Sequence, residues 1–412
     1  MAQKRKVTEP RIWIILDHPM QIATALPLAT HWRKKTFVNL LISPHPYWSR
    51  VDIESYRQFF DDIFILERPD YTCQPIRVMF WLWQIQRLKR RISHLGIDCD
   101  DIIVGLSVFH YLENIVLSTH RHNLKIAIMP AIVYEECTRN LDQDIYYTPP
   151  EGWVANLLVE PVAGLYRTYC KKEKLYPETY WRLRYRKPLL EIYDQVLVMG
   201  ETPTKNSLDN QRIIAIPYPY VLALDETELE VVKRDSEKKV VFFGDSFVDG
   251  LWGVKADVYA RYLNHCLSYL RTTYGTTHQL IYRPHPAETD EERKYLDLSQ
   301  FEIETDGILA ELYFYQNLKN IDTVFSVAST SSRAAFHFFL NAYSFIDIFP
   351  FDNIAKTALK KEMGNVPCEF FIQELSGIQP RYVKPENMNN ARKSCQNALD
   401  MVLQYQRQDK IL

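Results

Sequence analysis

Short apolar runs alternate with longer stretches of helical periodicity through the first half of the chain. The runs that we interpret as strands lie at residues 12–16, 36–42, 62–66, 101–106, 124–129 and 195–199, and the periodic stretches predict helices at 20–34, 75–95 and 107–123. Strands that are apolar at nearly every position and alternate with helices are typical of a parallel sheet covered on both faces. The first half therefore predicts a doubly wound, Rossmann-like α/β domain.

The same alternation starts again in the second half. Strands are predicted at 239–243, 279–282, 323–327 and 343–347, and helices at 254–274, 309–318 and 331–340. Residues 212–216 and the following Pro217-Tyr218-Pro219 are interpreted as a connection, because prolines disfavour the continuation of a helix. We place the boundary near residues 201–215, which predicts an N-terminal domain at 1–205, a C-terminal domain at 206–380 and a helical tail at 381–412.

Composition excludes several classes of protein. The 412 residues carry a formal net charge of −2, which gives no electrostatic reason to expect nucleic acid as a partner. Glycine is scarce, and neither a G-x-G-x-x-G dinucleotide motif nor a P-loop is present. The seven cysteines are scattered without a C-x-x-C pair, which indicates a reducing compartment and predicts neither a disulfide framework nor a zinc site. With no signal-peptide core and no apolar run of about 18 residues, we expect a cytoplasmic protein.

Candidate chemistry follows the predicted strands of the second half, at the edge where ligands bind in open α/β sheets. The loop after residues 239–243 begins with Gly244, a candidate for donor binding, and Asp245, and it continues to Asp249. Either carboxylate is a candidate general base for deprotonating an acceptor hydroxyl, which requires an ionised group within hydrogen-bond reach. The alternative is an ordinary strand-end turn, in which Asp and Gly serve backbone geometry and capping.

A histidine between two prolines follows the next strand. The run Arg283-Pro284-His285-Pro286 comes directly after residues 279–282. The prolines restrict the backbone on both sides, so the imidazole is held at the end of a strand, where it can bind a donor phosphate or protonate a leaving phosphate. Arg283 is a second candidate for binding an anion, because its guanidinium is a planar fork. The alternative is a structural histidine in a tight loop.

Four consecutive hydroxyl residues lie at the start of the next predicted helix. They are Ser329, Thr330, Ser331 and Ser332. Hydroxyls and backbone N–H groups at a helix N-terminus form an anion site that suits a nucleotide phosphate or a sugar carboxylate. Plain N-capping is the alternative, although a cap needs only one hydroxyl. Glu304 is a candidate for binding ribose hydroxyls, but for residues 301–307 we favour a solvated turn.

These motifs resemble those of bacterial sialyltransferases that use CMP-sialic acid, including lipooligosaccharide sialyltransferases and capsular polysialyltransferases. Those enzymes share a [DE]-[DE]-G motif, an HP motif and an S-[ST] motif. The matching positions here are Val248-Asp249-Gly250, His285-Pro286 and Ser331-Ser332, with Ser329-Thr330 as a second match for the last. The resemblance spans about residues 238–348. Val248 departs from the family pattern, in which an acidic residue stands at that position.

The resemblance implies a fold and a set of roles. Two Rossmann-like domains would face each other across a cleft in the GT-B arrangement, with the acceptor side in the N-terminal domain and the nucleotide-sugar site in the C-terminal domain. Asp249 would be the base, with Asp245 as its rival. His285 would contact or protonate the CMP phosphate, and Ser331 and Ser332 would bind the donor. Such enzymes invert the anomeric configuration of the sugar and can work without a bound metal, and we expect no separate cofactor.

The donor and the reaction stay open among several alternatives. The His-Pro and Ser-Ser pairs also resemble teichoic-acid glycerophosphotransferases that use CDP-glycerol, and capsule Kdo transferases that use CMP-Kdo. All three donors carry cytidine, so we expect transfer of a sugar, sialic acid or Kdo-like, from a CMP-activated donor to a capsule or lipopolysaccharide glycan of the cell surface. A glycerophosphotransferase or another nucleotide-sugar transferase is one alternative. A non-catalytic binding protein on a degenerate GT-B fold, which Val248 favours, is the other.

Features of the first half concern the acceptor. His18 follows the first strand and is an alternative base or a turn histidine, and His110 lies at another strand-to-helix junction on the same side. The segments Trp83–Leu95 and Leu165–Tyr193 combine basic and aromatic residues, as do helices that lie on anionic membranes. They are candidates for a peripheral contact with the inner face of the membrane, where glycolipid acceptors reside. The alternative, a solvated helix face, is the one we favour.

Overall fold

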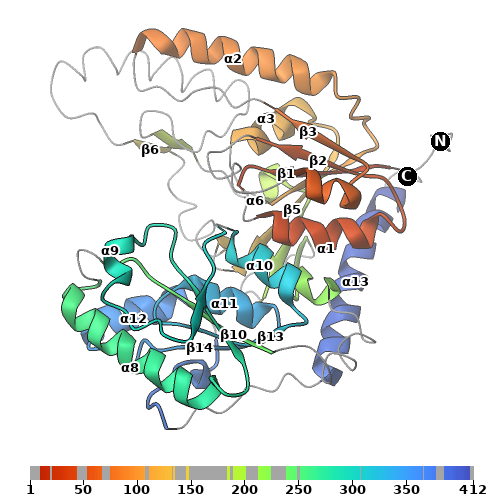
Figure 1. The fold of residues 1–412 in the computed structure, drawn as a ribbon. Coiled ribbons are helices and arrows are strands. Elements are labelled where there is room, and N and C mark those ends of the chain that lie inside the picture. Colours follow the sequence, from red (N-terminus) through yellow and green to blue (C-terminus); the bar gives the residue numbers. More distant parts are fainter. Residues whose placement is uncertain are drawn as a thin grey trace. The chain divides into compact units, whose positions relative to one another are not determined.

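The structure is a computed structural model of the chain (Figure 1). It describes residues 10–18, 21–43, 53–66, 75–106, 111–131, 133–134, 145–147, 183–185, 189–200, 212–223, 238–247, 251–306, 308–364, 366–376 and 385–408. The chain divides into two compact units. Unit 1 comprises Met1–Pro219 together with Ser394–Leu412, and unit 2 comprises Tyr220–Lys393.

Unit 1 is built on a seven-stranded parallel sheet. Its strands are β1 (Ile12–Leu16), β2 (Val38–Ile42), β3 (Asp62–Ile65), β4 (Ile102–Gly105), β5 (Leu124–Pro130), β8 (Gln195–Met199) and β9 (Ile213–Ile216). They lie in the order β3-β2-β1-β4-β5-β8-β9, and every neighbouring pair is parallel. The strand order reverses its direction between β1 and β4. In doubly wound sheets this switch point is where ligands bind, beyond the carboxyl ends of the strands.

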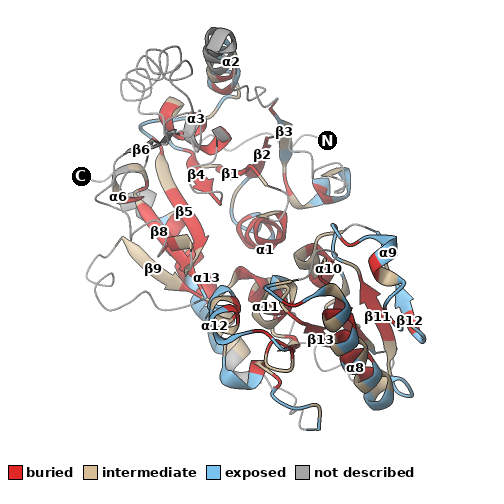
Figure 2. Cartoon of the chain, turned by 90° about the vertical axis from the view of Figure 1, so that its left-hand side faces the viewer, coloured by how far each residue is buried: buried red, intermediate tan, exposed pale blue. Residues whose placement is uncertain are grey.

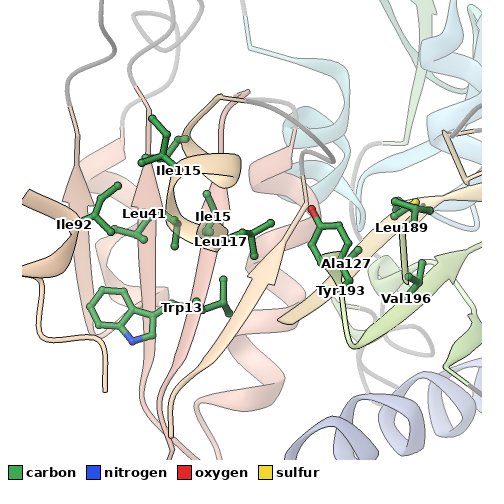
Figure 3. Close-up of a cluster of buried hydrophobic side chains, with 14 of the residues drawn as sticks. Trp13, Ile15, Leu41, Ile92, Ile115, Leu117, Ala127, Leu189, Tyr193 and Val196 are labelled. Carbon is green, nitrogen blue, oxygen red and sulfur yellow. The ribbon is translucent and has the colours of Figure 1, made fainter. Parts of the chain in front are cut away.

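Helices cover both faces of this sheet (Figures 1 and 2). They are α1 (Ile22–Trp32), α2 (Pro75–Ser93), α3 (Tyr111–Thr119) and α6 (Leu189–Ile192). Side chains of a strand alternate between the two faces, so Trp13 and Ile15 of β1 join α2 and α3 in one buried cluster (Figure 3). Ile14 points to the opposite face, which α1 covers. Nearly every residue of α1 is buried, as expected for a helix that is apolar all round.

The last helix, α13 (Pro385–Gln408), returns the chain to unit 1. His31 Nε2 lies 2.8 Å from Asp400 Oδ1. The indole N–H of Trp32 donates a hydrogen bond to the Leu399 carbonyl at 3.2 Å. Because both side chains come from the end of α1, these contacts fasten the second half of α13 to the first unit.

Unit 2 repeats the arrangement on a five-stranded parallel sheet. Its strands are β10 (Lys239–Phe243), β11 (Gln279–Arg283), β12 (Phe301–Ile303), β13 (Ile321–Ser326) and β14 (Asn341–Ser344), in the order β12-β11-β10-β13-β14. Its helices are α8 (Ala256–Tyr274), α9 (Asp290–Arg293), α10 (Ala310–Asn317), α11 (Thr330–His337) and α12 (Asn353–Glu362). The direction of the strand order reverses between β10 and β13. The two sheets therefore share the same Rossmann-like topology around their first strands.

Shorter elements complete the described part of the chain. Strands β6 (Ile145–Tyr147) and β7 (Leu183–Tyr185) form a separate antiparallel pair, and 3-10 turns lie at η3 (Ile53–Phe59), η5 (Pro219–Ala223) and η6 (Cys368–Phe370). Among the described helices, none combines the length and the apolar character needed to cross a bilayer.

The sequence patterns predict most of the two sheets. The strands β1, β8 and β10 have the predicted bounds, and the predicted class of two Rossmann-like α/β domains is confirmed. Two expectations were wrong. Residues 212–216 were expected to be a connection, but all of them except Arg212 form the edge strand β9, so the first sheet continues almost to the unit boundary at Pro219. Residues 301–307, expected to be a solvated turn, begin with the edge strand β12, whose exposed Glu302 interrupts the apolar signal.

Candidate functional site

Three loops leave the sheet of unit 2 at neighbouring positions. Phe243, the last residue of β10, pairs with Arg283 on β11 and with Ser326 on β13. Adjacent strands lie about 5 Å apart, so the loops after β11 and β13 start roughly 10 Å from each other, on either side of the loop after β10. This is the switch point of the second sheet. The three loops that the sequence predicts to carry chemistry are therefore brought together.

Asp245 connects the loop after β10 to the loop after β13 by a hydrogen bond. The residue is 8% exposed, and its Oδ2 accepts hydrogen bonds from the Tyr259 hydroxyl at 3.0 Å and from the Ala328 N–H at 3.3 Å. Burial raises the pKa of Asp245, while these two donors and the charge of the nearby His285 oppose the rise. The carboxyl thus joins the end of β10 to α8 and to the loop after β13, within electrostatic range of the histidine.

His285 stands at the exposed rim of the second loop, with Pro286 beside it. Its Nδ1 accepts a hydrogen bond from the Ala287 N–H at 3.1 Å. In the neutral ring the proton therefore lies on Nε2. The backbone carbonyl of His285 accepts the Glu288 N–H at 2.8 Å, which closes a turn. This turn presents a ring N–H donor at the edge of the sheet.

Glu288 lies beneath the turn, with its side chain fully buried. Its Oε2 accepts the Tyr282 hydroxyl at 2.9 Å and the His285 N–H at 3.3 Å. Burial raises the pKa of Glu288 to about 7, against the opposing effects of these hydrogen bonds and of Arg293. A Cβ at Gly244 would collide with the Tyr282 hydroxyl and the Glu288 carboxyl, so only glycine fits there. Packing thus explains Gly244, whose role in donor binding stays a prediction, and no sequence signal had pointed to Glu288.

A short helix, α9, ties the second loop to the first. At its start the Thr289 hydroxyl accepts the Glu292 N–H at 3.3 Å, and Glu292 Oε2 accepts the Thr289 N–H at 2.6 Å. The other oxygen of Glu292 accepts the Phe247 N–H, from the loop after β10, at 2.5 Å. The T-x-x-E pattern of this capping box is visible in the sequence and could have predicted the helix start. The bond to Phe247 carries no sequence signal.

The hydroxyl-rich start of α11 divides into an inner and an outer part. Ser332 is fully buried, and its hydroxyl donates to the Ser329 carbonyl at 3.2 Å and accepts from the Ser326 hydroxyl at 2.8 Å. Ser329 is the N-cap, and its Oγ accepts the Ser331 N–H at 3.3 Å. Thr330 is exposed and Ser331 is half-buried. Capping and packing account for the inner hydroxyls, whereas Thr330 and Ser331 have surface that a ligand can reach.

Arg283 is 5% exposed, and its guanidinium is bound by other groups of the protein. It pairs with Glu304 at 2.8 Å and with Asp306 at 2.6 Å, and it donates to the Ile308 carbonyl at 2.9 Å. Its Cζ lies 3.9 Å from the centre of the Tyr313 ring. These contacts join β11 to the segment after β12 and to α10. They favour a structural role for Arg283 and Glu304, and donor binding by either residue stays a prediction.

The first sheet has polar groups of its own at its switch point. Asp17, directly after β1, is 2% exposed, and its carboxylate accepts the N–H groups of Leu112 at 3.1 Å and Glu113 at 3.2 Å. The half-buried His18 is held through its backbone, which exchanges two hydrogen bonds of 3.1 Å with Gln21. Asp17 therefore caps the first turn of α3. The role of His18 as a base stays a prediction.

Several predicted features lie outside the described residues. They are Asp249 with Val248 and Gly250, His110, and most of the segment Leu165–Tyr193. Within the described ranges, no group of three or more His, Cys, Asp or Glu side chains could hold a metal ion. The expectation of a metal-independent reaction stays a prediction.

Comparisons with known proteins bear on the fold. No family model and no curated protein matches the chain. Among solved structures, UDP-GlcNAc 2-epimerase from Methanocaldococcus jannaschii is similar over 95% of this chain and 99% of its own, with 10% identity and a TM-score of 0.52. A UDP-glucosyltransferase from Polygonum tinctorium covers 98% of this chain and 100% of its own (12% identity, TM-score 0.48), and an alpha/beta-galactoside alpha-2,3-sialyltransferase from Photobacterium phosphoreum covers 90% and 100% (11% identity, TM-score 0.47).

The chain has a two-domain α/β fold of the GT-B type. The two parallel Rossmann-like sheets and the similarity to the epimerase over nearly the whole of both chains agree on this point. At 10% identity the likeness concerns the fold alone.

Proposed function

We propose that the chain is an inverting, metal-independent glycosyltransferase that transfers a sugar from a CMP-activated donor to a cell-surface glycan. The observation that supports this proposal most is the meeting of three loops at the switch point of the second sheet. A histidine N–H donor follows β11 and a helix N-terminus that carries hydroxyls follows β13, on either side of the loop after β10. Both features favour a phosphate ester, because both stabilise negative charge on oxygen.

In the proposed reaction, an acceptor oxygen attacks the anomeric carbon of the donor sugar and loses its proton to a carboxylate base. The bond between the anomeric carbon and the phosphate oxygen breaks, and CMP leaves with the electron pair. The Nε2–H of His285 donates to the phosphate oxygens as charge develops there, or transfers its proton to them. Attack opposite the leaving group inverts the anomeric centre.

We assign the base to Asp249 and a bracing role to Asp245. A base must reach the acceptor hydroxyl, whereas Asp245 is buried and its Oδ2 already accepts two protein donors. Asp249 follows in the same loop, at the acidic position of the family motif. An Asp249→Asn variant should lose turnover and keep CMP affinity. If it keeps turnover, His18 becomes the candidate to test next.

The outer hydroxyls of α11 are proposed to bind the donor. Thr330 and Ser331 lie in the first turn, where amides and the helix dipole also favour an anion. Ser332, the inner partner of the S-[ST] match, supports this turn through its buried bonds to Ser326 and Ser329. The donor would therefore contact the turn that Ser332 holds in place rather than Ser332 itself.

Thermal stabilisation by nucleotides tests the donor class. CMP or CDP at 100 times its dissociation constant adds about 2.7 kcal/mol to the stability of the binding unit, and we expect a smaller effect from UDP and GDP.

His285→Ala should abolish turnover, while the matched control His265→Ala, at an exposed position on α8, should leave it unchanged. If no cytidine nucleotide raises the thermal stability of the protein, the proposal is contradicted. A phosphodiester product from CDP-glycerol would identify a glycerophosphotransferase instead. The non-catalytic alternative would be favoured if the wild type shows no turnover and the His285→Ala variant still binds its partner.

We further propose that α2 contacts the anionic surface of the membrane that carries the acceptor. Trp83 is 55% exposed, the Arg87 guanidinium lies 5.8 Å from the centre of its ring, and Arg90 and Arg91 are exposed. No acidic residue occurs between residues 71 and 97. Basic helices with exposed aromatic residues bind vesicles that contain anionic lipids. Co-sedimentation with phosphatidylglycerol vesicles, but not with phosphatidylcholine vesicles, is expected and should weaken when Arg90 and Arg91 are replaced by Gln. Equal binding to both lipids contradicts the proposal.

A further inference from the structure

We propose that Glu288 is the positioning residue for His285, an inference that rests on the proposed function of the His285 ring. The carboxyl acts on the histidine through the backbone of the turn that joins them. It controls which ring nitrogen faces the ligand and how firmly the ring is held.

Two hydrogen bonds run in opposite directions across this turn. The Glu288 N–H donates to the His285 carbonyl at 2.8 Å, and the His285 N–H donates to Glu288 Oε2 at 3.3 Å. Within the same turn, the Ala287 N–H donates to His285 Nδ1 at 3.1 Å. Because Ala287 lies between the two bonded residues, the contact that selects the ring tautomer depends on the turn staying closed.

The sheet fixes the position of the Glu288 carboxyl. The Tyr282 hydroxyl donates to the same oxygen at 2.9 Å, and Tyr282 is fully buried, with its ring stacked on Phe242 at a centroid distance of 5.8 Å. Gly244 lies so close to both groups that a Cβ would collide with them. The histidine turn is thus connected through one carboxyl to the core of β10 and β11.

Burial makes the charge state of Glu288 sensitive to pH. In the described part of the chain, the buried Oε1 has no hydrogen-bond partner, and it lies 3.9 Å from Arg293 Nη1. The other titratable groups that act on this carboxyl are Tyr282 on β11 and Glu292 on α9. Asp245, just after β10, acts in turn on Tyr282 and lies within electrostatic range of His285. Burial raises the pKa of Glu288 to about 7. A carboxylate accepts an N–H more strongly than a carboxylic acid does, so the turn tightens as Glu288 ionises.

The test follows the His285 ring by NMR in the full chain and needs no substrate. With ¹⁵N-labelled histidine, the His285 signals are those lost in His285→Gln. For the wild type we expect the Nε2–H tautomer in the neutral ring, and an additional inflection near pH 7 that comes from Glu288. Glu288→Gln keeps an acceptor oxygen, so the tautomer should persist while the additional inflection disappears. Glu288→Ala should give a mixture of both tautomers.

Two results would overturn the inference. One is an unchanged tautomer in a Glu288→Ala protein whose other histidine signals show that it is folded. The other is an additional inflection that persists in Glu288→Gln. Should the Ala variant not fold, the Gln variant decides alone. Glu291→Gln serves as the matched control, because this α9 carboxyl is exposed and pairs with Lys294, and its spectra should equal those of the wild type.

Kinetics separate the failure of this inference from the failure of the proposed function. If the wild type transfers sugar from a CMP-activated donor, Glu288→Ala should lower kcat about tenfold and change KM little, because misplacing a catalytic group costs rate more than binding. If the NMR results hold but the wild type neither binds CMP nor turns over, the proposed function fails and the positioning of His285 stands. If turnover is found and the NMR results fail, the positioning of His285 by Glu288 fails and the proposed function stands.

Discussion

Replacing Arg283 by Ala tests whether this guanidinium holds unit 2 together or binds the donor. Removing one member of a buried ion pair costs about 3–5 kcal/mol. The side chains of Glu304 and Asp306 are 18% and 40% exposed, so water can partly replace the lost partner, and we lower this figure to about 2 kcal/mol. Loss of the contact with the Tyr313 ring adds about 1 kcal/mol. We therefore expect the free energy of unfolding of unit 2 to fall by about 3 kcal/mol.

Native-state hydrogen exchange, followed by mass spectrometry on peptides from β10 and β11, measures this change within unit 2. Arg283→Lys keeps the charge but not the planar fork and should lose about half as much. Arg261→Ala, at an exposed position on α8, is the matched control and should change stability by less than about 0.5 kcal/mol. CMP affinity of the folded Arg283→Ala protein should stay within about twofold of the wild type, or about 0.4 kcal/mol. A stability loss below about 1 kcal/mol, together with a tenfold loss of affinity, would refute this reasoning and make Arg283 a ligand group.

The buried groups of the three loops should respond in distinct ways. The pKa of Glu288 is about 7 in the folded protein and 4.5 in the unfolded chain, so the native state binds more protons between these values. Hydrogen exchange should therefore show that unit 2 loses about 3 kcal/mol as the pH rises from 4.5 to 7. This loss should be absent in Glu288→Gln, and an equal loss in both proteins would assign it to another group. Asp245→Ala leaves the buried Tyr259 hydroxyl unpaired and should cost about 2–3 kcal/mol in the same assay, a prediction that a neutral effect would contradict. Ser332→Ala should cost about 1 kcal/mol of stability. Ser331→Ala should leave stability unchanged and weaken CMP binding in a calorimetric titration. The opposite pattern would make Ser332 the donor-binding residue and Ser331 the structural one.

The fold could be predicted from the sequence wherever strands are buried on both faces. All five residues of β1 are buried, and all five are apolar, so the run stands out without an alignment. The edge strand β12 has a buried Phe301 followed by the exposed Glu302 and Ile303, and such a short mixed segment has the composition of a turn. The sheet edge, rather than local preference, makes it a strand through its pairing with β11.

Sequence could predict the positions of the site residues but not all of their partners. The prolines around His285 and the hydroxyls at the start of α11 indicate loops at strand ends, and the structure places both at the switch point. Arg283 has the same appearance in the sequence whether it binds a phosphate or two carboxylates. Its partners Glu304 and Asp306 come 21 and 23 residues later, and only the register of β11 and β12 brings them together. The same holds for Asp245, whose donors come from α8 and from the loop after β13.

A crystal structure with CMP bound tests most directly the central claim that the three loops of unit 2 bind a cytidine nucleotide. The proposed site predicts phosphate oxygens within about 3 Å of His285 Nε2 and of the Thr330 or Ser331 donors in the first turn of α11. CMP bound away from these loops, or no bound CMP at a saturating concentration, would contradict it.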